Sequence, residues 1–117
     1  MSQYYGSCHC GEIKFSIFFE GEELTTCDCS LCVKKNALML RVHESQLELI
    51  AGESMLAEYK WNMKIAQHYF CKQCGIYTFH RKRSQPDHFG INVYCLADFD
   101  LTKFPVRMTD GITMSLK

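Results

Sequence analysis

Hydrophobic and polar residues alternate along much of this chain with a period of two. The clearest run covers residues 13–19, where isoleucine or phenylalanine stands at every odd position. Because successive side chains of a strand point to opposite faces of a sheet, this pattern predicts a half-buried β-strand.

Further runs are rich in the aromatic and β-branched residues that favour strands. They cover residues 37–42, 46–50, 56–61, 65–70, 76–80 and 89–96. Polar or glycine-containing turns separate several of them, as at 43–45 and 84–87. One helical turn is expected over residues 30–35, with Ser30 as its N-cap. The pattern therefore predicts a mostly β, antiparallel fold in a single domain over residues 1–117.

The composition is that of a folded chain. Of 117 residues, 47% are hydrophobic and two are proline, which excludes a disordered chain. No apolar run approaches the roughly 18 residues of a membrane span, and no signal peptide is visible. The 13 basic and 13 acidic residues cancel, so the charge does not favour nucleic acid as a partner. We therefore expect a cytoplasmic protein with no membrane partner.

Seven of the eight cysteines fall into three short groups. These are Cys8-His9-Cys10, Cys27-Asp28-Cys29-Ser30-Leu31-Cys32 and Cys71-Lys72-Gln73-Cys74, with Cys95 apart. Cysteines this close rarely form disulfides with each other, because the Cα separation and the Cβ directions must both fit. Without a secretion signal, a disulfide framework is not expected. The spacing therefore favours metal binding.

The first and last groups each supply two thiolates followed by a glycine. Together Cys8, Cys10, Cys71 and Cys74 would complete a closed four-cysteine site of the structural zinc type. Ligation by thiolates alone favours zinc, with an iron–sulfur cluster as the alternative.

The middle group supplies three thiolates, from Cys27, Cys29 and Cys32. Three protein ligands leave a tetrahedral zinc with one open position, as in catalytic sites. Zinc with three thiolates carries about −1 charge, so it suits a soft substrate sulfur better than the generation of hydroxide. Two zinc ions per chain are therefore expected.

Spacing alone leaves other arrangements open. All seven cysteines could form closed structural sites with one histidine as the eighth ligand, or Cys8 and Cys10 could join the middle group. The candidate histidines are His9, His43, His68, His80 and His88.

Other conspicuous residues favour ordinary structural roles. The basic cluster Arg81-Lys82-Arg83 could contact phosphates, but a solvated strand end is favoured. Several aromatic residues could line a pocket, but at strand spacing they favour the core; these are Tyr59, Trp61, Phe70, Tyr77 and Phe79. Cys95 lies in an apolar run and is expected to be a buried free thiol.

Taken in order, the three cysteine groups and their flanking glycines resemble the glutathione-dependent formaldehyde-activating (GFA) family. The resemblance extends roughly from Tyr4 to Asp100. Residues 66–71 and 89–91, with Cys95-Leu96, are similar to the branch that includes centromere protein V.

The resemblance implies a zinc-containing, mostly antiparallel β fold, also seen in B-type methionine-R-sulfoxide reductases. It implies structural zinc at Cys8, Cys10, Cys71 and Cys74, and catalytic zinc at Cys27, Cys29 and Cys32. The implied activity joins formaldehyde, or a related small carbonyl compound, to glutathione or a similar thiol, as a carbon–sulfur lyase running in reverse.

This chain departs from the family pattern at Asp28, where many members carry histidine or another residue. No motif identifies a clamp for the glutathione carboxylates, and Lys34, Lys35 and Arg41 are candidates by position alone. Two alternative functions stay open: a non-catalytic zinc-stabilised module that binds protein or nucleic acid, and thiol redox chemistry at Cys95.

Overall fold

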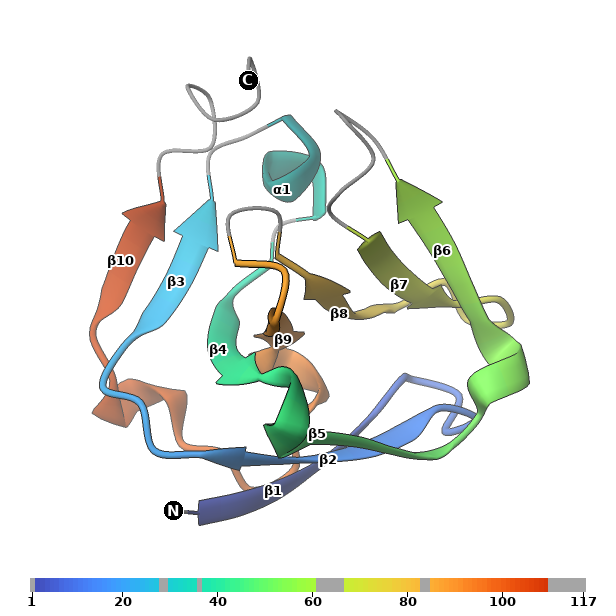
Figure 1. Ribbon diagram of the computed structural model, residues 1–117, viewed down its shortest axis with the longest axis horizontal. Helices are drawn as coiled ribbons and strands as arrows, with labels where there is room; N and C mark the ends of the chain where they lie inside the picture. The colour runs from blue at the N-terminus through green and yellow to red at the C-terminus, as the bar shows by residue number, and fades with distance from the viewer. Residues whose placement is uncertain (1, 28–29, 36, 61–66, 83–84, 110–117) are drawn as a thin grey trace.

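The computed structural model describes residues 2–27, 30–35, 37–60, 67–82 and 85–109, without the side chains of Ser30, Cys32 and Thr109. Its strands form two sheets (Figure 1). The smaller sheet has the order β1-β2-β5, with β1 at Ser2–Ser7, β2 at Lys14–Phe19 and β5 at Leu47–Ala51.

The larger sheet contains seven strands in the order β10-β3-β4-β9-β8-β7-β6. Their bounds are β3 Leu24–Cys27, β4 Met39–His43, β6 Leu56–Lys60, β7 Gln67–Cys71, β8 Tyr77–Arg81, β9 His88–Asn92 and β10 Val106–Thr109. In the described residues, β10 runs parallel to β3 and every other strand pair is antiparallel. The antiparallel expectation is therefore correct except at this edge.

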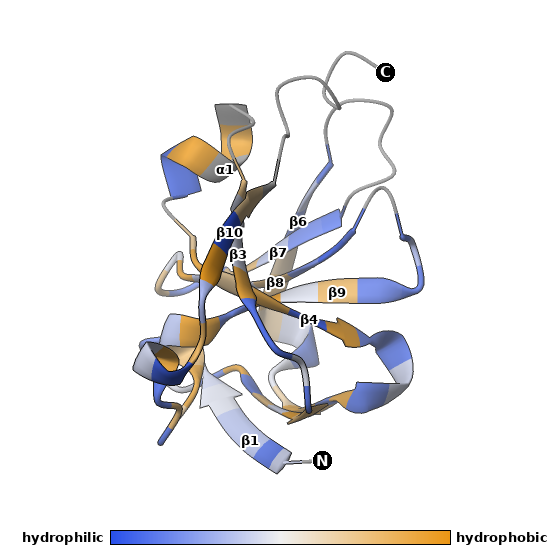
Figure 2. Ribbon diagram, turned by 90° about the vertical axis from the view of Figure 1, so that its left-hand side faces the viewer, coloured by the Kyte–Doolittle hydropathy of each residue, from blue (hydrophilic) through white to orange (hydrophobic). Residues whose placement is uncertain are grey.

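The hydrophobic core lies between the two sheets. Phe15 of β2 meets Phe79 of β8 edge to face, with ring centroids 5.3 Å apart. Figure 2 shows hydrophobic segments at the centre of the molecule, where β3, β4 and β9 lie close together. Edge-to-face aromatic pairs add to the free energy gained by burying the rings.

The alternating pattern over residues 13–19 is confirmed. Ile13, Phe15 and Ile17 are completely buried, whereas Phe18 is exposed. Ser16 is also buried, so the alternation of burial is incomplete at this position. The other predicted runs correspond to strands β4 to β9, with ends shifted by a few residues.

The predicted strand over residues 89–96 is wrong at its end. β9 stops at Asn92, whose side chain accepts a hydrogen bond from the Tyr94 N–H and starts the short 3₁₀ helix Val93–Cys95. Three strands were not predicted at all, namely β1, β3 and β10. Trp61 lies outside the described residues.

The predicted helical turn is present as α1, Ser30–Lys35. The side chain of Ser30 and the residues before it lie outside the description, so its role as the N-cap stays a prediction. Figure 1 shows α1 at the same end of the molecule as the ends of β3 and β10. No helix in the described part of the chain is long and apolar enough to cross a membrane.

Candidate metal centre and polar cluster

Two loops of equal length form the candidate metal centre. Residues 8–13 follow β1, and residues 71–76 run from the last residue of β7 to the start of β8. In each loop, the N–H of the first cysteine donates to the carbonyl of an isoleucine five residues later, at 3.2 Å for Cys8 and 3.0 Å for Cys71. The turns of Cys-x-Cys-Gly-x-Ile and Cys-x-x-Cys-Gly-Ile thus occupy the same length of chain.

A glycine follows the second cysteine in both loops and has a positive φ. The angles are 84° at Gly11 and 78° at Gly75. A side chain would strain this left-handed conformation. The chain can therefore turn sharply after each cysteine pair, which aims both sulfurs inward.

The four sulfurs of these loops gather at one point. All lie within 4.8 Å of one another, and the sulfur of Cys10 is 3.6 Å from those of Cys8 and Cys71. Tetrahedral zinc, with Zn–S bonds of about 2.3 Å, requires sulfur–sulfur separations of about 3.8 Å. A disulfide requires about 2.05 Å. The spacing therefore fits shared ligands of a metal and does not fit disulfides.

Backbone N–H groups surround the sulfurs. Cys8 accepts a hydrogen bond from the Ile13 N–H at 3.4 Å, and Cys71 accepts from the N–H groups of Gln73 and Cys74 at 3.4 and 3.5 Å. Such donors stabilise thiolates. This cluster of Cys8, Cys10, Cys71 and Cys74 is hereafter the four-cysteine cluster.

The cluster cannot hold four negative charges without a cation. Burial raises the pKa of Cys74, but hydrogen bonds from backbone N–H groups and neighbouring thiols outweigh this and lower it to about 6. At Cys10 the Glu12 N–H lowers the pKa, but burial and the neighbouring sulfurs raise it to about 12. A bound metal ion would let all four sulfurs be thiolates together, so the donor set fits zinc.

Of the three cysteines predicted to form the second zinc site, the structure describes the side chain of Cys27 alone. Cys27 is the last residue of β3 and is half-buried. Asp28 and Cys29 lie outside the described residues, as does the side chain of Cys32 in α1. The second zinc site therefore stays a prediction.

None of the candidate histidines belongs to the four-cysteine cluster. His9 is exposed. His43 and His88 lie at the surface around Asp87, with His43 Nε2 3.5 Å and His88 Nδ1 2.8 Å from its carboxylate oxygens. The remaining two, His68 and His80, are buried together below α1.

His68 and His80 belong to a second group of side chains, the polar cluster, formed by Lys35, His68, Tyr77 and His80. The two imidazole rings stack with centroids 4.8 Å apart and planes 14° from parallel. Lys35 Nζ lies 2.9 Å from His68 Nδ1 and 3.7 Å from the centre of the Tyr77 ring. The Tyr77 hydroxyl lies 2.6 Å from His80 Nδ1.

A β-bulge brings Tyr77 into this cluster. In a regular strand, residues three apart point to opposite faces, so Tyr77 and His80 would be separated by the sheet. The pairing of β7 with β8 shifts between Tyr69 and Phe70, which leaves Thr78 as an extra residue. The shift turns Tyr77 to the side of His80, a use of bulges common near functional sites.

Both histidines of the polar cluster are neutral. Burial, with a smaller effect of the Lys35 ammonium, lowers the pKa of His68 to about 3. Burial also holds the pKa of His80 well below its ordinary value, with smaller effects of Lys35, His68 and Lys82. Because an ammonium can only donate, His68 Nδ1 accepts from Lys35 and carries no proton.

Gly90 of β9 makes room for the His80 ring. A Cβ at this position would lie 2.4 Å from His80 Cε1. The Gly90 carbonyl also accepts a hydrogen bond from the Tyr77 hydroxyl at 3.3 Å. Gly90 therefore contributes to the polar cluster in two ways: its missing side chain leaves room for the His80 ring, and its carbonyl accepts a hydrogen bond from Tyr77.

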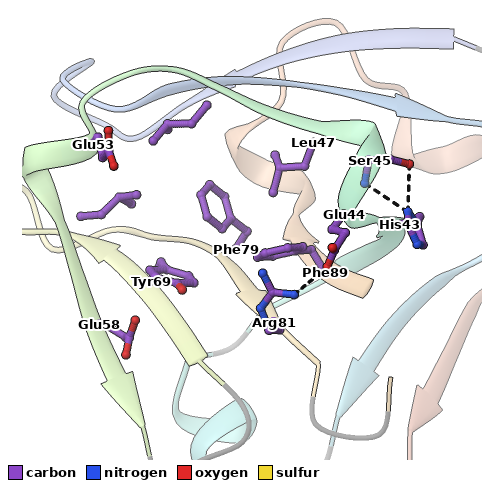
Figure 3. Close-up of a pocket in the computed structure, with 12 residues that line it drawn as sticks. His43, Glu44, Ser45, Leu47, Glu53, Glu58, Tyr69, Phe79, Arg81 and Phe89 are labelled. Atoms are coloured by element: carbon purple, nitrogen blue, oxygen red, sulfur yellow. Dashed lines mark hydrogen bonds and ion pairs between the residues drawn. The ribbon is translucent and has the colours of Figure 1, made fainter. Parts of the chain in front are cut away.

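A separate pocket of about 710 Å³ opens on the other face of β7 and β8 (Figure 3). Leu47, Phe79 and Phe89 supply apolar surface, and the Glu44–Arg81 pair lies beside them. Because side chains alternate along a strand, Phe79 faces this pocket while its neighbour His80 faces the polar cluster. No cysteine is among the described residues that line it.

The basic cluster at residues 81–83 has a structural role at Arg81. Its Nη1 lies 2.8 Å from Glu44 Oε2 and also donates to the Pro86 carbonyl. Its guanidinium lies over the Phe89 ring, 4.6 Å from the centroid. These contacts agree with the expected strand end; Arg83 lies outside the described residues.

The remaining residues that the sequence singled out differ in their burial and contacts. Phe79 is in the core, whereas Tyr59 is exposed. Cys95 is a half-buried free thiol whose pKa burial raises to about 12, with smaller effects of Cys8 and Cys74. Of the clamp candidates, Lys35 belongs to the polar cluster, while Arg41 donates to Gln85 Oε1 at 2.7 Å.

Two sheets and a four-cysteine metal-ligand cluster define a mostly β protein with a candidate metal centre. The model of the family described as glutathione-dependent formaldehyde-activating enzyme matches residues 3–109. The chain belongs to this family. A crystal structure of a Rhodobacter sphaeroides protein, a structural-genomics target, matches with a TM-score of 0.81 and 32% identity, over 88% of this chain and 99% of that chain.

Proposed function

We propose that this protein is a zinc-dependent enzyme of the carbon–sulfur lyase type that joins a small carbonyl compound to a thiol. Formaldehyde and glutathione are the proposed substrates, and S-hydroxymethylglutathione is the product. Membership of the family over residues 3–109 is the observation that carries this proposal. The gathered sulfurs of the four-cysteine cluster support it.

The two groups of cysteines have different roles in this proposal. The four-cysteine cluster would hold a structural zinc, because its four thiolates leave no position for a substrate. Cys27, Cys29 and Cys32 would hold the second zinc, which when bound would stabilise the substrate sulfur as a thiolate. Residues 1–117 would thus act as one zinc-binding domain. Unbridged cysteines persist in reducing compartments, so we place the reaction in the cytoplasm.

NMR exchange spectroscopy on formaldehyde, glutathione and their adduct tests the activity. We expect the zinc-loaded protein to accelerate exchange and Cys29→Ser to lose the acceleration while keeping its fold. Zinc analysis should give two ions per chain for the parent and one for Cys29→Ser.

Cys95→Ser serves as the matched control and should keep both zinc ions and the acceleration. Full activity in Cys29→Ser would contradict the assignment of the three-cysteine group. No acceleration by the parent would contradict the enzyme proposal and favour a non-catalytic binding module.

A further inference from the structure

The pocket in Figure 3 lies between the two sheets, on the face of β7 and β8 that is turned away from the polar cluster. Strand β5 of the small sheet supplies Leu47 and Leu49, and the large sheet supplies the opposite wall. The volume of about 710 Å³ is within the range of pockets that bind small organic molecules. Its size and position make it a candidate binding site of its own.

Three aromatic rings form a continuous wall on the large-sheet side of this pocket. The ring centroids of Tyr69 and Phe79 lie 5.6 Å apart, and those of Phe79 and Phe89 lie 5.8 Å apart. Rings at these distances pack favourably against one another, and a further aromatic ring would pack against them in the same way. The wall therefore suits a ligand with a flat, apolar body.

The charged residues around the pocket are mostly acidic. Among the described residues that line it, Glu44, Glu53 and Glu58 stand against one guanidinium, that of Arg81. Arg81 Nη1 already lies 2.8 Å from Glu44 Oε2, and its guanidinium lies over the Phe89 ring. A ligand anion would have to displace Glu44 from this ion pair, so the pocket does not favour an anion.

Glu53 and Glu58 lie at the end of the pocket away from Arg81 (Figure 3). In the part of the chain that the structure describes, the Glu53 carboxylate makes no ion pair. Glu58 Oε1 lies 3.1 Å from Lys60 Nζ. Its charge nevertheless reaches the pocket wall, because burial and then Glu58 raise the pKa of Tyr69 against a smaller opposite effect of Arg81. This end of the pocket is therefore negative.

We propose that this pocket binds a small organic cation, with an aromatic body against the three-ring wall and a primary ammonium between Glu53 and Glu58. An ammonium has three N–H donors and no acceptor, which matches two carboxylates. Burial of the apolar body would supply most of the affinity, and the charges would fix the orientation. No cysteine is among the described residues that line the pocket, so the site is independent of the proposed reaction.

Titration of the zinc-loaded protein with tryptamine, followed by amide NMR shifts, tests the site. Tryptamine carries an indole ring and a primary ammonium, whereas indole-3-propionate carries the same ring and a carboxylate. We expect saturable shifts at the pocket, including the amides of Glu53 and Phe89, with a Kd near or below about 1 mM for tryptamine. Indole-3-propionate should bind at least about tenfold more weakly, because its charge has the same sign as the glutamates.

Two variants test the charges. Glu53→Gln keeps the size of the side chain but removes its charge, and it should weaken tryptamine binding about three- to fivefold. The matched control is Glu48→Gln. Glu48 is exposed and stands between Leu47 and Leu49 on β5, so its side chain points to the opposite face of the strand. This control should leave the Kd unchanged.

Three results would overturn the proposal. Equal affinities for tryptamine and indole-3-propionate would contradict a cation-selective pocket. An equal loss in Glu53→Gln and Glu48→Gln would mean that net charge, and not a contact, attracts the ligand. Shifts confined to residues outside the pocket, or no saturable shifts up to about 10 mM tryptamine, would contradict the site itself. The formaldehyde–glutathione exchange measurement is separate, so the proposed function stands or fails independently of these results.

Discussion

The sulfurs of Cys10 and Cys71 lie 3.6 Å apart, although 61 residues separate them in the chain. The contact joins the loop after β1 to the loop between β7 and β8. A metal bound there would hold the small sheet against the large one. The candidate centre is therefore expected to contribute to folding itself.

Removal of the metal should unfold most of the protein. Structural zinc contributes about 10 kcal/mol or more of binding free energy, comparable with the whole stability of a typical domain. Treatment with a strong chelator, or the variant Cys71→Ser, should abolish the thermal unfolding transition seen by circular dichroism. Cys95→Ser should unfold nearly as the parent does, since Cys95 is outside the cluster. A chelated protein with an unchanged transition would contradict this role.

The neutral histidines should make the protein less stable in acid. The folded protein keeps His68 neutral down to about pH 3, whereas the unfolded chain binds a proton below the ordinary pKa of 6.5. The free energy of unfolding therefore falls as the pH falls from 6.5 towards 3. His68 alone should account for about 1 kcal/mol between about pH 7 and about pH 5.5.

Urea unfolding at those two pH values, with zinc content checked at each, measures this loss. His68→Gln cannot bind the proton and should show a smaller difference between the two. Its metal ligands are those of the parent, so ligand protonation affects both proteins equally. The same pH dependence in both would mean that His68 is not held neutral.

Substitution of Gly90 by alanine should strain the polar cluster. The added Cβ would lie 2.4 Å from His80 Cε1, and the buried ring has little room to move. We expect Gly90→Ala to lower the free energy of unfolding by about 1–3 kcal/mol, as overpacking does. In a His80→Ala background the same substitution should cost much less. An equal cost in both backgrounds, measured by urea unfolding, would place the strain elsewhere.

Arg81 is expected to stabilise the fold slightly and not to bind nucleic acid. Its contacts with Glu44 and Phe89 are partly exposed, so Arg81→Gln should lower the free energy of unfolding by about 1 kcal/mol or less. Affinity for double-stranded DNA at low salt should be weak in both proteins. Salt-dependent binding by the parent that Arg81→Gln abolishes would support the nucleic-acid alternative instead.

Alternation was enough to predict the strands whose two faces differ in burial. The run at residues 13–19 is the best example, because its odd positions meet the core and two of its even positions meet solvent. β10 gave no such signal, since Val106 and Met108 are exposed although they are apolar. It is a strand because residues 24–27 pair with it, and such distant pairing leaves no local pattern.

The ligands of the four-cysteine cluster could be proposed from spacing because each pair is local. The polar cluster could not, since its members come from α1, β7 and β8. Tyr77 and His80 even have the wrong spacing for a shared face, and only the bulge at Thr78 joins them. Lys35 was a candidate by position, but its contact with His68 spans 33 residues.

The parallel pairing of β10 with β3 has a consequence for biosynthesis. The strand that ends at Cys27 emerges early from the ribosome, but its outer neighbour ends at residue 109. A nascent chain thus presents β3 as an open sheet edge throughout most of its translation, and open edges recruit other strands. Ribosome-bound chains of this protein should therefore depend on chaperones until β10 has emerged.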